Sequence, residues 1–503
     1  MGFALLIIYW LGWHFGMYAL LKKAGVENTK ALIPIYNTWE VVKLCKINPF
    51  WFWIQLVPIV GQFVSIWISI IFVMHFKKVN FIQHTLTVLV PFIYLPYLGN
   101  AATTKWHGGE ALVHYHKPAT REWIDAAVFA VVAATLIRTF LFEAYVIPTE
   151  SMEKTLLVND FLFVDKLTYG ARVPQTPLSF PFVHNTMPGS ATTPSYLKWI
   201  QLDYNRLPKF RDIKRNDVVV FNFPAGDTII NLPEFGSKMP YYDVLRSPEY
   251  NGDRAKLQSE FPILVHPIDK TDNYIKRCVG IPGDLIQLKN GQLWVNGNPA
   301  FVAPNAQTEY IVVTDGKSIP EDYIQDSLGI SGLEASADFQ AMPDSPNSFL
   351  INMTASAASN LKKLPFIKSV NLYVENRVGI TFPNDILHFP WTADNFGAIR
   401  IPKKGDVISL NDSTIELYRR LICNYEKNSL EKIKGQYVIN GIVTSSYTVK
   451  QNYYWMMGDN RHRSQDSRFW GFVPETHIVG RAALIWFSYS SSIRWNRIFS
   501  LIK

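Results

Sequence analysis

The 503-residue chain contains few cysteines and no long basic run. Its three cysteines, Cys45, Cys278 and Cys423, are too few and too scattered for a disulfide framework or a zinc site. The N-terminus has neither the positively charged segment nor the small-residue cleavage site of a removable signal peptide, so we predict a retained anchor. Basic and aromatic residues do not alternate in a stripe, and nucleic-acid binding is therefore not predicted. Anionic lipid headgroups are a more natural partner for the net charge of +8.

Hydrophobic residues make up 48% of the chain, and the excess is concentrated before residue 150. A helix needs about 20 predominantly apolar residues to cross a bilayer. Four segments approach or exceed this length, and we predict that each is a span. The four segments are Gly2–Leu21, Phe50–Phe76, Phe81–Leu98 and Ile124–Val146. The sequence thus predicts a multi-span membrane region over 1–123 and an anchor helix over 124–147.

Basic residues predict the orientation of these spans, because lysine and arginine in short loops mark the cytoplasmic side. One basic set follows the first span and another precedes the last, so with four spans both sets are cytoplasmic and the chain after Val146 is outside. Two observations weaken the third span: Lys77 and Lys78 would face outward, and Pro91 and Pro96 interrupt it. A re-entrant third segment is the alternative. The two basic sets are Lys22, Lys23, Lys30, Lys43 and Lys46, then Lys105, Lys117 and Arg121.

Two ionisable residues, Arg138 and Glu143, lie in the last predicted span. Charged groups inside a membrane are functional candidates by default. These two are in the outer part of the span, where a long side chain can reach the headgroups. We expect them to reach outward or to pair with neighbouring residues.

The chain after Val146 consists of short apolar runs rich in β-branched residues, separated by Gly, Pro, Asn and Asp. This pattern predicts a mainly β domain over 148–503. Two stretches, about 225–270 and 298–397, show little periodicity and are interpreted as insertions. The predicted strands are 218–223, 274–281, the two halves of 284–297, 437–443 and 453–459.

The stretch IPTESMEKTL (147–156) places Ser151 just after the last span. A serine hydroxyl is protonated at neutral pH and needs a nearby base before it can act as a nucleophile. The chain has no G-x-S-x-G motif, and no histidine in the soluble part has a motif that would pair it with a serine. Burial lowers the pKa of lysine, so a buried lysine can be the base instead. Lys276, in the apolar run YIKRCVGIPGD (274–284), is the best candidate.

Four segments in order, IPTESMEKTL, KRNDVVVFNFP, YIKRCVGIPGD and GDNRHRSQDSRFWGFVPE, resemble the successive conserved boxes of type I signal peptidases. These enzymes are the membrane-anchored serine–lysine leader peptidases of bacteria. The resemblance covers roughly 124–165, 214–224, 273–288 and 438–487. It leaves out the first 120 residues and the two long insertions.

The resemblance implies roles for individual residues. Ser151 would be the nucleophile, Lys276 the general base, and the Ser151 amide with the Thr149 hydroxyl the oxyanion hole. Ser464 would hold the lysine amine, and Met152 would pack beside the nucleophile. The remaining residues would form two structural ion pairs, Arg277 with Asp459 and Asp466 with Arg468.

Three residues depart from the family pattern. Thr149 replaces the more usual serine but keeps a hydroxyl. Glu150 stands where a small residue is common, and Lys154 where many members have proline. We expect Glu150 to face solvent or headgroups, because a carboxylate pointing into the site would raise the pKa of the lysine.

The resemblance also implies a function: removal of signal peptides from exported preproteins at A-x-A-like sites, without a metal or other cofactor. The enzyme would lie in the bacterial cytoplasmic membrane with its catalytic domain on the extracytoplasmic side. Its partners would be preproteins, the lipid bilayer and the protein-export channel. Two alternatives stay open. One is an inactive membrane-anchored binding module of the same fold, and the other is a membrane protease that depends on Cys278 or a metal.

Overall fold

The computed structural model describes residues 2–503 except 57–59, 114, 191–192, 225–227, 231–234, 236–238, 331–337 and 344; at 2–10, 60, 62 and 228–229 it describes the backbone alone. The chain divides into two compact units, Met1–Val132 and Ala133–Lys503. The boundary between the units falls inside one helix, α7 (Ala119–Phe140).

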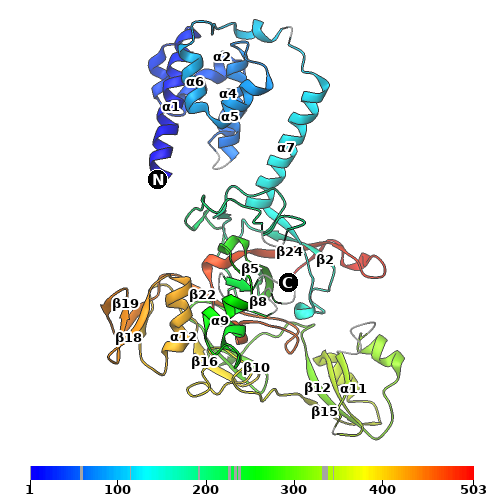
Figure 1. The fold of residues 1–503 in the computed structure, drawn as a ribbon. Coiled ribbons are helices and arrows are strands. Elements are labelled where there is room, and N and C mark those ends of the chain that lie inside the picture. The colour runs from blue at the N-terminus through cyan, green and yellow to red at the C-terminus, as the bar shows by residue number, and fades with distance from the viewer. Residues whose placement is uncertain are drawn as a thin grey trace. The chain divides into compact units, whose positions relative to one another are not determined.

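The unit Met1–Val132 is helical (Figure 1). Its first helix packs on its sixth, because glycine at position 16 lets the two backbones approach closely. A Cβ on Gly16 would lie only 2.4 Å from the Cβ of Leu95. Buried side chains from several helices, including Leu21, Val42, Phe72 and Leu95, form its core. The helices are α1 (Gly2–Lys23), α2 (Tyr36–Leu44), α3 (Phe50–Ile54), α4 (Val60–Met74), α5 (Phe81–Leu89) and α6 (Pro91–Asn100), with 3-10 turns η1 (Asn28–Leu32) and η2 (Gly108–Leu112).

The predicted third span is wrong as a single helix. Residues 81–98 form α5 and α6, with a break at Val90, whose φ is −135° and ψ is 50°. Proline has no amide hydrogen and disfavours helical geometry in the preceding residue, so Pro91 begins a new helix. The predicted second span likewise contains two helices, α3 and α4, and residues 57–59 between them are outside the described residues.

Helix α7 is the one helix among the described residues that is long and apolar enough to cross a membrane. None of its residues is buried, and the side chain of Phe129 is 75% exposed. The predicted anchor over 124–147 is wrong at its C-terminal end. The helix ends at Phe140, and strand β1 (Phe142–Val146) follows, with Glu143 buried between exposed neighbours. That alternation suits a strand that pairs with β2 (Asp160–Asp165).

An eight-stranded antiparallel sheet forms the centre of the unit Ala133–Lys503 (Figure 1). Its order is β1-β2-β24-β5-β8-β22-β23, and β25 also pairs with β24. The predicted strands at 218–223, 274–281 and 453–459 are confirmed as β5, β8 and β22. The strands not yet defined are β5 (Val218–Asn222), β8 (Asn273–Gly280), β22 (Tyr453–Met457), β23 (Val473–Pro474), β24 (Ile478–Ser488) and β25 (Ser500–Leu501).

Side chains cover this sheet on both faces. Alternate residues of β5 point to different cores: Val218 and Val220 to one, Val219 and Phe221 to the other. All five residues of β5 are buried, as expected for a central strand. The two strands that follow β8, β9 (Leu285–Lys289) and β10 (Gln292–Val295), confirm the hairpin predicted over 284–297.

Smaller elements surround this centre. The stretch 298–397 contains a four-stranded sheet with a core of its own, and 225–270 contains two short helices around a second small core. The strand predicted over 437–443 is two short strands, β19 and β20. The remaining strands are β3 (Arg172–Val173), β4 (Asn205–Arg206), β6 (Thr228–Ile230), β7 (Ile263–Val265), β11 (Asn298–Pro299), β12 (Gln307–Thr314), β13 (Phe339–Ala341), β14 (Ser348–Thr354), β15 (Ile367–Leu372), β16 (Phe396–Arg400), β17 (Val407–Ser409), β18 (Leu430–Ile433), β19 (Gln436–Ile439), β20 (Ile442–Val443) and β21 (Ser446–Thr448). The remaining α-helices are α8 (Tyr241–Arg246), α9 (Arg254–Glu260), α11 (Ala355–Leu361), α12 (Ile415–Arg420) and α13 (Ser467–Trp470).

Candidate active site

Ser151 lies in a short 3-10 turn, η3 (Glu150–Met152), that follows β1. Thr149 precedes the turn in an extended conformation, with φ −136° and ψ 158°. Met152, the last residue of the turn, has no exposed surface and packs in the core with Leu162 and Val218. The buried Met152 side chain thus fixes the turn against the sheet, and Ser151 itself is only 6% exposed.

Lys276 lies on β8, opposite Val219 of β5, and is 3% exposed. Its Nζ donates a hydrogen bond of 2.7 Å to Ser151 Oγ and one of 3.0 Å to the carbonyl oxygen of Ile275. The ring centroid of Tyr274 lies 5.3 Å from Nζ. A hydroxyl and an amine at this distance have the geometry that general-base activation of a nucleophile requires.

The environment of Lys276 favours its neutral form. Burial lowers the pKa of Lys276 to about 8 from the usual 10.5, although the negative charges of Asp466 and Asp459 act in the opposite direction. Removal from water disfavours the ammonium ion, and this effect is the larger one. An amine with a pKa near neutrality can accept a proton at physiological pH.

Both carboxylates near Lys276 are held by buried arginines. Arg277 donates two hydrogen bonds to Asp459, of 2.8 and 2.6 Å, and Arg468 donates two of 2.9 Å to Asp466. All four side chains are at most 2% exposed. Because each carboxylate has its own guanidinium, the two aspartates raise the pKa of Lys276 less than free carboxylates would.

Ser464 is buried beside the turn that contains Ser151 but makes no hydrogen bond to Lys276. Its hydroxyl has no hydrogen-bond partner among the described residues, so the structure does not bring together the Ser464 hydroxyl and the Lys276 amine. Gly458 allows the close approach at this point. A Cβ on Gly458 would lie 2.2 Å from Ser464 Oγ and 2.5 Å from the carbonyl oxygen of Ser151, distances that no side chain could occupy.

Thr149 is exposed at the start of the turn, and its hydroxyl makes no capping bond within η3. The Thr149 hydroxyl and the backbone N–H of Ser151 lie two residues apart in one short segment, as the two donors of an oxyanion hole would need. Sequence reasoning missed Asn460, which fixes this segment from the other side. The backbone N–H of Asn460 donates to the Ser151 carbonyl oxygen at 3.1 Å, and its side-chain NH₂ donates to the Glu150 carbonyl oxygen at 3.2 Å. Its position directly after Asp459 was the available signal.

One charged residue, Glu150, begins the turn, and another, Lys154, follows it. Lys154 has a positive φ of 63° and donates from Nζ to the carbonyl oxygen of Gly329, 2.7 Å away. Its charge is therefore directed to the 298–397 stretch. Glu150 is half-buried.

Cys278 lies two residues after Lys276 on the same strand and is fully buried. Burial raises the pKa of its thiol, and its Sγ contacts the Gly280 carbonyl oxygen at 3.4 Å. A thiol that resists ionisation is a poor nucleophile. Among the described residues, no group of three or more His, Cys, Asp or Glu could hold a metal ion.

A buried serine with a lysine amine in hydrogen-bonding distance, on a mainly β scaffold, defines the class: a serine peptidase. Comparison with known proteins agrees. The sequence model of the family described as "Signal peptidase, peptidase S26" matches residues 120–343 and 398–487. That is more than half of the chain, and the chain belongs to this family. The predicted resemblance to type I signal peptidases is thereby confirmed. Residues 29–109 match a second family, DUF5684, of unknown function.

Individual relatives of this chain are named signal peptidase I. Signal peptidase I of Haemophilus influenzae is 25% identical over 386 residues, which cover 75% of each chain. Signal peptidase I of Buchnera aphidicola is 24% identical over 379 residues, covering 73% of this chain and 78% of the relative. A shorter match to signal peptidase I of Aquifex aeolicus reaches 57% identity over 74 residues, or 12% of this chain and 28% of the relative.

Proposed function

We propose that this serine peptidase cleaves signal peptides from preproteins with Ser151 as the nucleophile and Lys276 as the general base. The observation that carries the proposal is the 2.7 Å hydrogen bond between Lys276 Nζ and Ser151 Oγ. Neutral Lys276 takes the proton from the hydroxyl as the oxygen attacks the scissile carbonyl. The C–N bond breaks as Lys276 gives this proton to the leaving amine of the mature protein, and an acyl-enzyme remains. Water then gives a proton to Lys276 and attacks the ester, and Ser151 recovers its proton as the signal peptide is released.

The Ser151 amide and the Thr149 hydroxyl would stabilise the charge that develops on the carbonyl oxygen. Their place on one turn supports this role. The ion pair of Arg277 with Asp459 holds β8 near the loop that follows β22. Asp466 connects the two ends of this loop, because it pairs with Arg468 and also accepts a hydrogen bond from the backbone N–H of Gly458.

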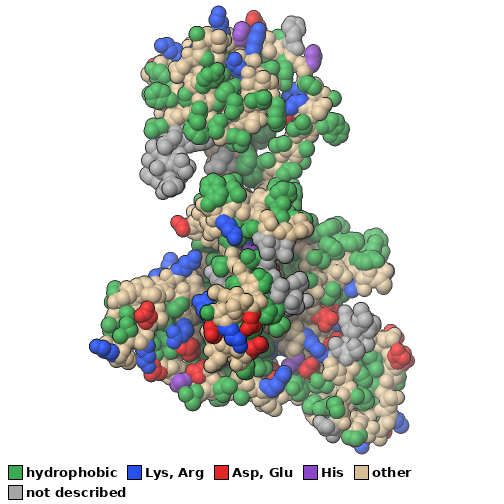
Figure 2. Space-filling view, in the orientation of Figure 1, with side chains coloured by type: hydrophobic (Ala, Val, Ile, Leu, Met, Phe, Trp, Pro, Cys, Tyr) green, Lys and Arg blue, Asp and Glu red, His purple; other side chains and the backbone are tan. Residues whose placement is uncertain are grey.

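The active residue Ser151 is eleven positions after the end of α7. We propose that α7 crosses the bacterial cytoplasmic membrane, that the N-terminal unit adds further spans, and that the β-rich domain over 148–503 lies on the extracytoplasmic side. Exposed apolar residues support contact with lipid: Figure 2 shows hydrophobic side chains gathered where α7 enters this unit. Phe180 and Phe182, which line a cavity together with Arg138 and Thr139 of α7, are 56% and 55% exposed.

A membrane-bound site would meet its substrate while the signal helix is still in the bilayer. The substrates we propose are exported preproteins with small residues at the first and third positions before the cleaved bond. The protein-export channel, which delivers such chains, is a proposed neighbour of the enzyme. No metal or other cofactor is needed for this chemistry.

The test is cleavage of a preprotein with an A-x-A site by the full-length protein in detergent, followed by mass analysis of the products. Ser151→Ala should abolish cleavage, and Lys276→Ala should reduce kcat at least about 100-fold, because general-base catalysis contributes at least this much. Full activity in either variant would refute the assignment.

Cys278→Ala is the matched control, since Cys278 is on the same strand and equally buried. We expect this variant to keep its activity. Loss of cleavage in Cys278→Ala with intact folding, or loss on addition of a chelator, would instead favour a cysteine- or metal-dependent protease.

A further inference from the structure

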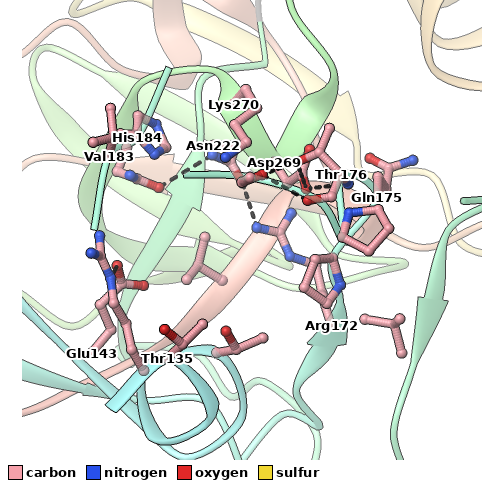
Figure 3. Close-up of a pocket in the computed structure, with 18 of the residues that line it drawn as sticks. Thr135, Glu143, Arg172, Gln175, Thr176, Val183, His184, Asn222, Asp269 and Lys270 are labelled. Atoms are coloured by element: carbon pink, nitrogen blue, oxygen red, sulfur yellow. Dashed lines mark hydrogen bonds and ion pairs between the residues drawn. The ribbon is translucent and has the colours of Figure 1, made fainter. Parts of the chain in front are cut away.

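A cavity lined by several charged side chains lies at the C-terminal end of α7, and neither Ser151 nor Lys276 lines it. The cavity has a volume of about 200 Å³ and is open to solvent. Figure 3 shows Thr135 and Glu143 on one side of it and Arg172, Asp269 and Thr176 on the other. Its walls come from α7, β1, the loop after β3, β5 and the turn before β8. All of these residues belong to the unit Ala133–Lys503.

The wall formed by α7 and β1 contains a paired set of charges. Glu143 accepts from Arg138 Nε at 2.5 Å, and Lys166 Nζ lies 2.7 Å from its other oxygen. The hydroxyl of Tyr145 also donates to Glu143, at 2.8 Å. One carboxylate thus faces two cations. The expected pairing of Arg138 with a neighbour is confirmed, and the set keeps one excess positive charge.

Across the cavity are two cations without an ion-pair partner. Lys270 is 7% exposed, and among the described residues its ammonium has no hydrogen bond or carboxylate partner, only the ring of Tyr196 at 5.5 Å. Arg172 donates to neutral groups, the Thr476 carbonyl at 2.9 Å and the Asn222 side chain at 2.5 Å. The one carboxylate on this side, Asp269, accepts two bonds from Thr176.

A buried cation without a counter-ion is costly. Burial lowers the pKa of Lys270, although the charge of Asp269 opposes the shift. An anion in the cavity would reverse this cost, because it would supply the charge and the hydrogen-bond acceptors that Lys270 lacks. Four cations and two carboxylates line the cavity, and the imbalance favours an anion carrying one or two negative charges.

We propose that this cavity binds the phosphate of an anionic phospholipid headgroup, with Lys270 and Arg172 as its ligands. The proposal rests on the proposed membrane anchoring by α7, since Arg138 and Thr139 of the last α7 turn line the cavity and place it at headgroup level. Two exposed aromatic residues at the cavity, Phe180 and Phe182, would lie among the acyl chains. A free phosphate ion has no acyl chains and would make no contact with these two aromatic side chains.

The test is the thermal stability of the full-length protein in detergent with three additives: short-chain phosphatidylglycerol, short-chain phosphatidylcholine and inorganic phosphate. We expect phosphatidylglycerol to raise Tm by about 3 °C at saturation, and the other two to have little effect. Lys270→Met should lose this rise. Its Tm without lipid should be no lower than that of the original protein, because the substitution removes a buried unpaired charge.

Lys198→Met is the matched control, since Lys198 is an exposed lysine that does not line the cavity and its removal changes the net charge equally. It should keep the rise in Tm. An equal loss in both variants would mean general surface attraction and would overturn the proposal. An equal rise with inorganic phosphate would overturn the lipid assignment, and Lys270→Arg, which keeps the charge, should retain the rise.

Preprotein cleavage in detergent, measured in parallel, separates this proposal from the proposed function. Lys270→Met should cleave normally, and Ser151→Ala should keep its lipid-induced rise in Tm. If the original protein fails to cleave but keeps a Lys270-dependent rise, the enzymatic assignment fails alone. If it cleaves but shows no rise with phosphatidylglycerol, the lipid site is refuted.

Discussion

The pH dependence of cleavage tests the role of Lys276 most directly. The amine must be neutral to accept a proton, and burial lowers its pKa to about 8 from 10.5. At pH 7 the neutral fraction is then about 10%, against about 0.03% for an ordinary lysine, a difference of about 300-fold. Activity should therefore rise about tenfold per pH unit below pH 8 and level off above it.

The assay is kcat/KM for an A-x-A peptide from pH 6 to 10, since this quantity reports ionisation in the free enzyme. Asp466→Asn should move the midpoint below 8, because the negative charge of Asp466 raises the pKa of Lys276. Asp412→Asn is the control, as Asp412 is 67% exposed and pairs with Lys432 at the surface. It should leave the midpoint unchanged.

A midpoint above 10, or a flat profile between pH 6 and 9, would refute the reasoning that a neutral lysine limits the rate. So would an upward shift in Asp466→Asn. Circular dichroism of each variant at the assay temperature must show a folded protein. If Asp466→Asn does not fold, the pH profile of kcat/KM for the original protein still tests whether neutral Lys276 limits the rate.

Three further predictions concern stability and packing. Lys276→Met should abolish cleavage yet raise the free energy of unfolding by about 2 kcal/mol below pH 8. This gain is the free-energy cost of the lowered lysine pKa less the contribution of the lysine's hydrogen bonds. Denaturant titration should show the gain shrinking between pH 8 and 10.5, because there the lysine holds its proton in the unfolded chain but not in the folded one. Gly458→Ala should lower kcat while the protein stays folded, because the new Cβ would displace Ser464 or the Ser151 carbonyl; an unchanged kcat would contradict this close contact. Met152→Ala should cost about 2–5 kcal/mol of unfolding free energy, measured by urea titration, since Met152 is fully buried; a loss under 1 kcal/mol would show that the turn is held elsewhere.

The sequence predicted the central strands well because β-branched runs between turn residues are local signals. It also brought Ser151 and Lys276 to attention, although they are 125 positions apart. That pairing depended on resemblance, because no local pattern states which strands become neighbours. The end of the anchor was misplaced since Phe142–Val146 contains Phe, Ala, Tyr and Val and follows the apolar helix after a single residue. Only pairing with β2 makes that segment a strand, and such pairing is not encoded locally.

Other features depended on three-dimensional context alone. Sequence reasoning expected Arg138 and Glu143 to reach outward or to pair with neighbours, but no pattern linked Lys166, Lys270 and Arg172 to them. Their common feature is the cavity they surround, which is formed by segments far apart in the sequence. The orientation of the Ser464 hydroxyl likewise follows from side-chain packing and not from its motif.

The position of β24 has a consequence for how the enzyme is made. This strand lies between β2, which leads from the segment bearing Ser151, and β5, which pairs with the strand bearing Lys276. Until residue 488 has left the ribosome, nothing in the sheet joins the two halves of the site. The growing chain therefore passes most of its synthesis with Ser151 and Lys276 on segments that no paired strand yet connects.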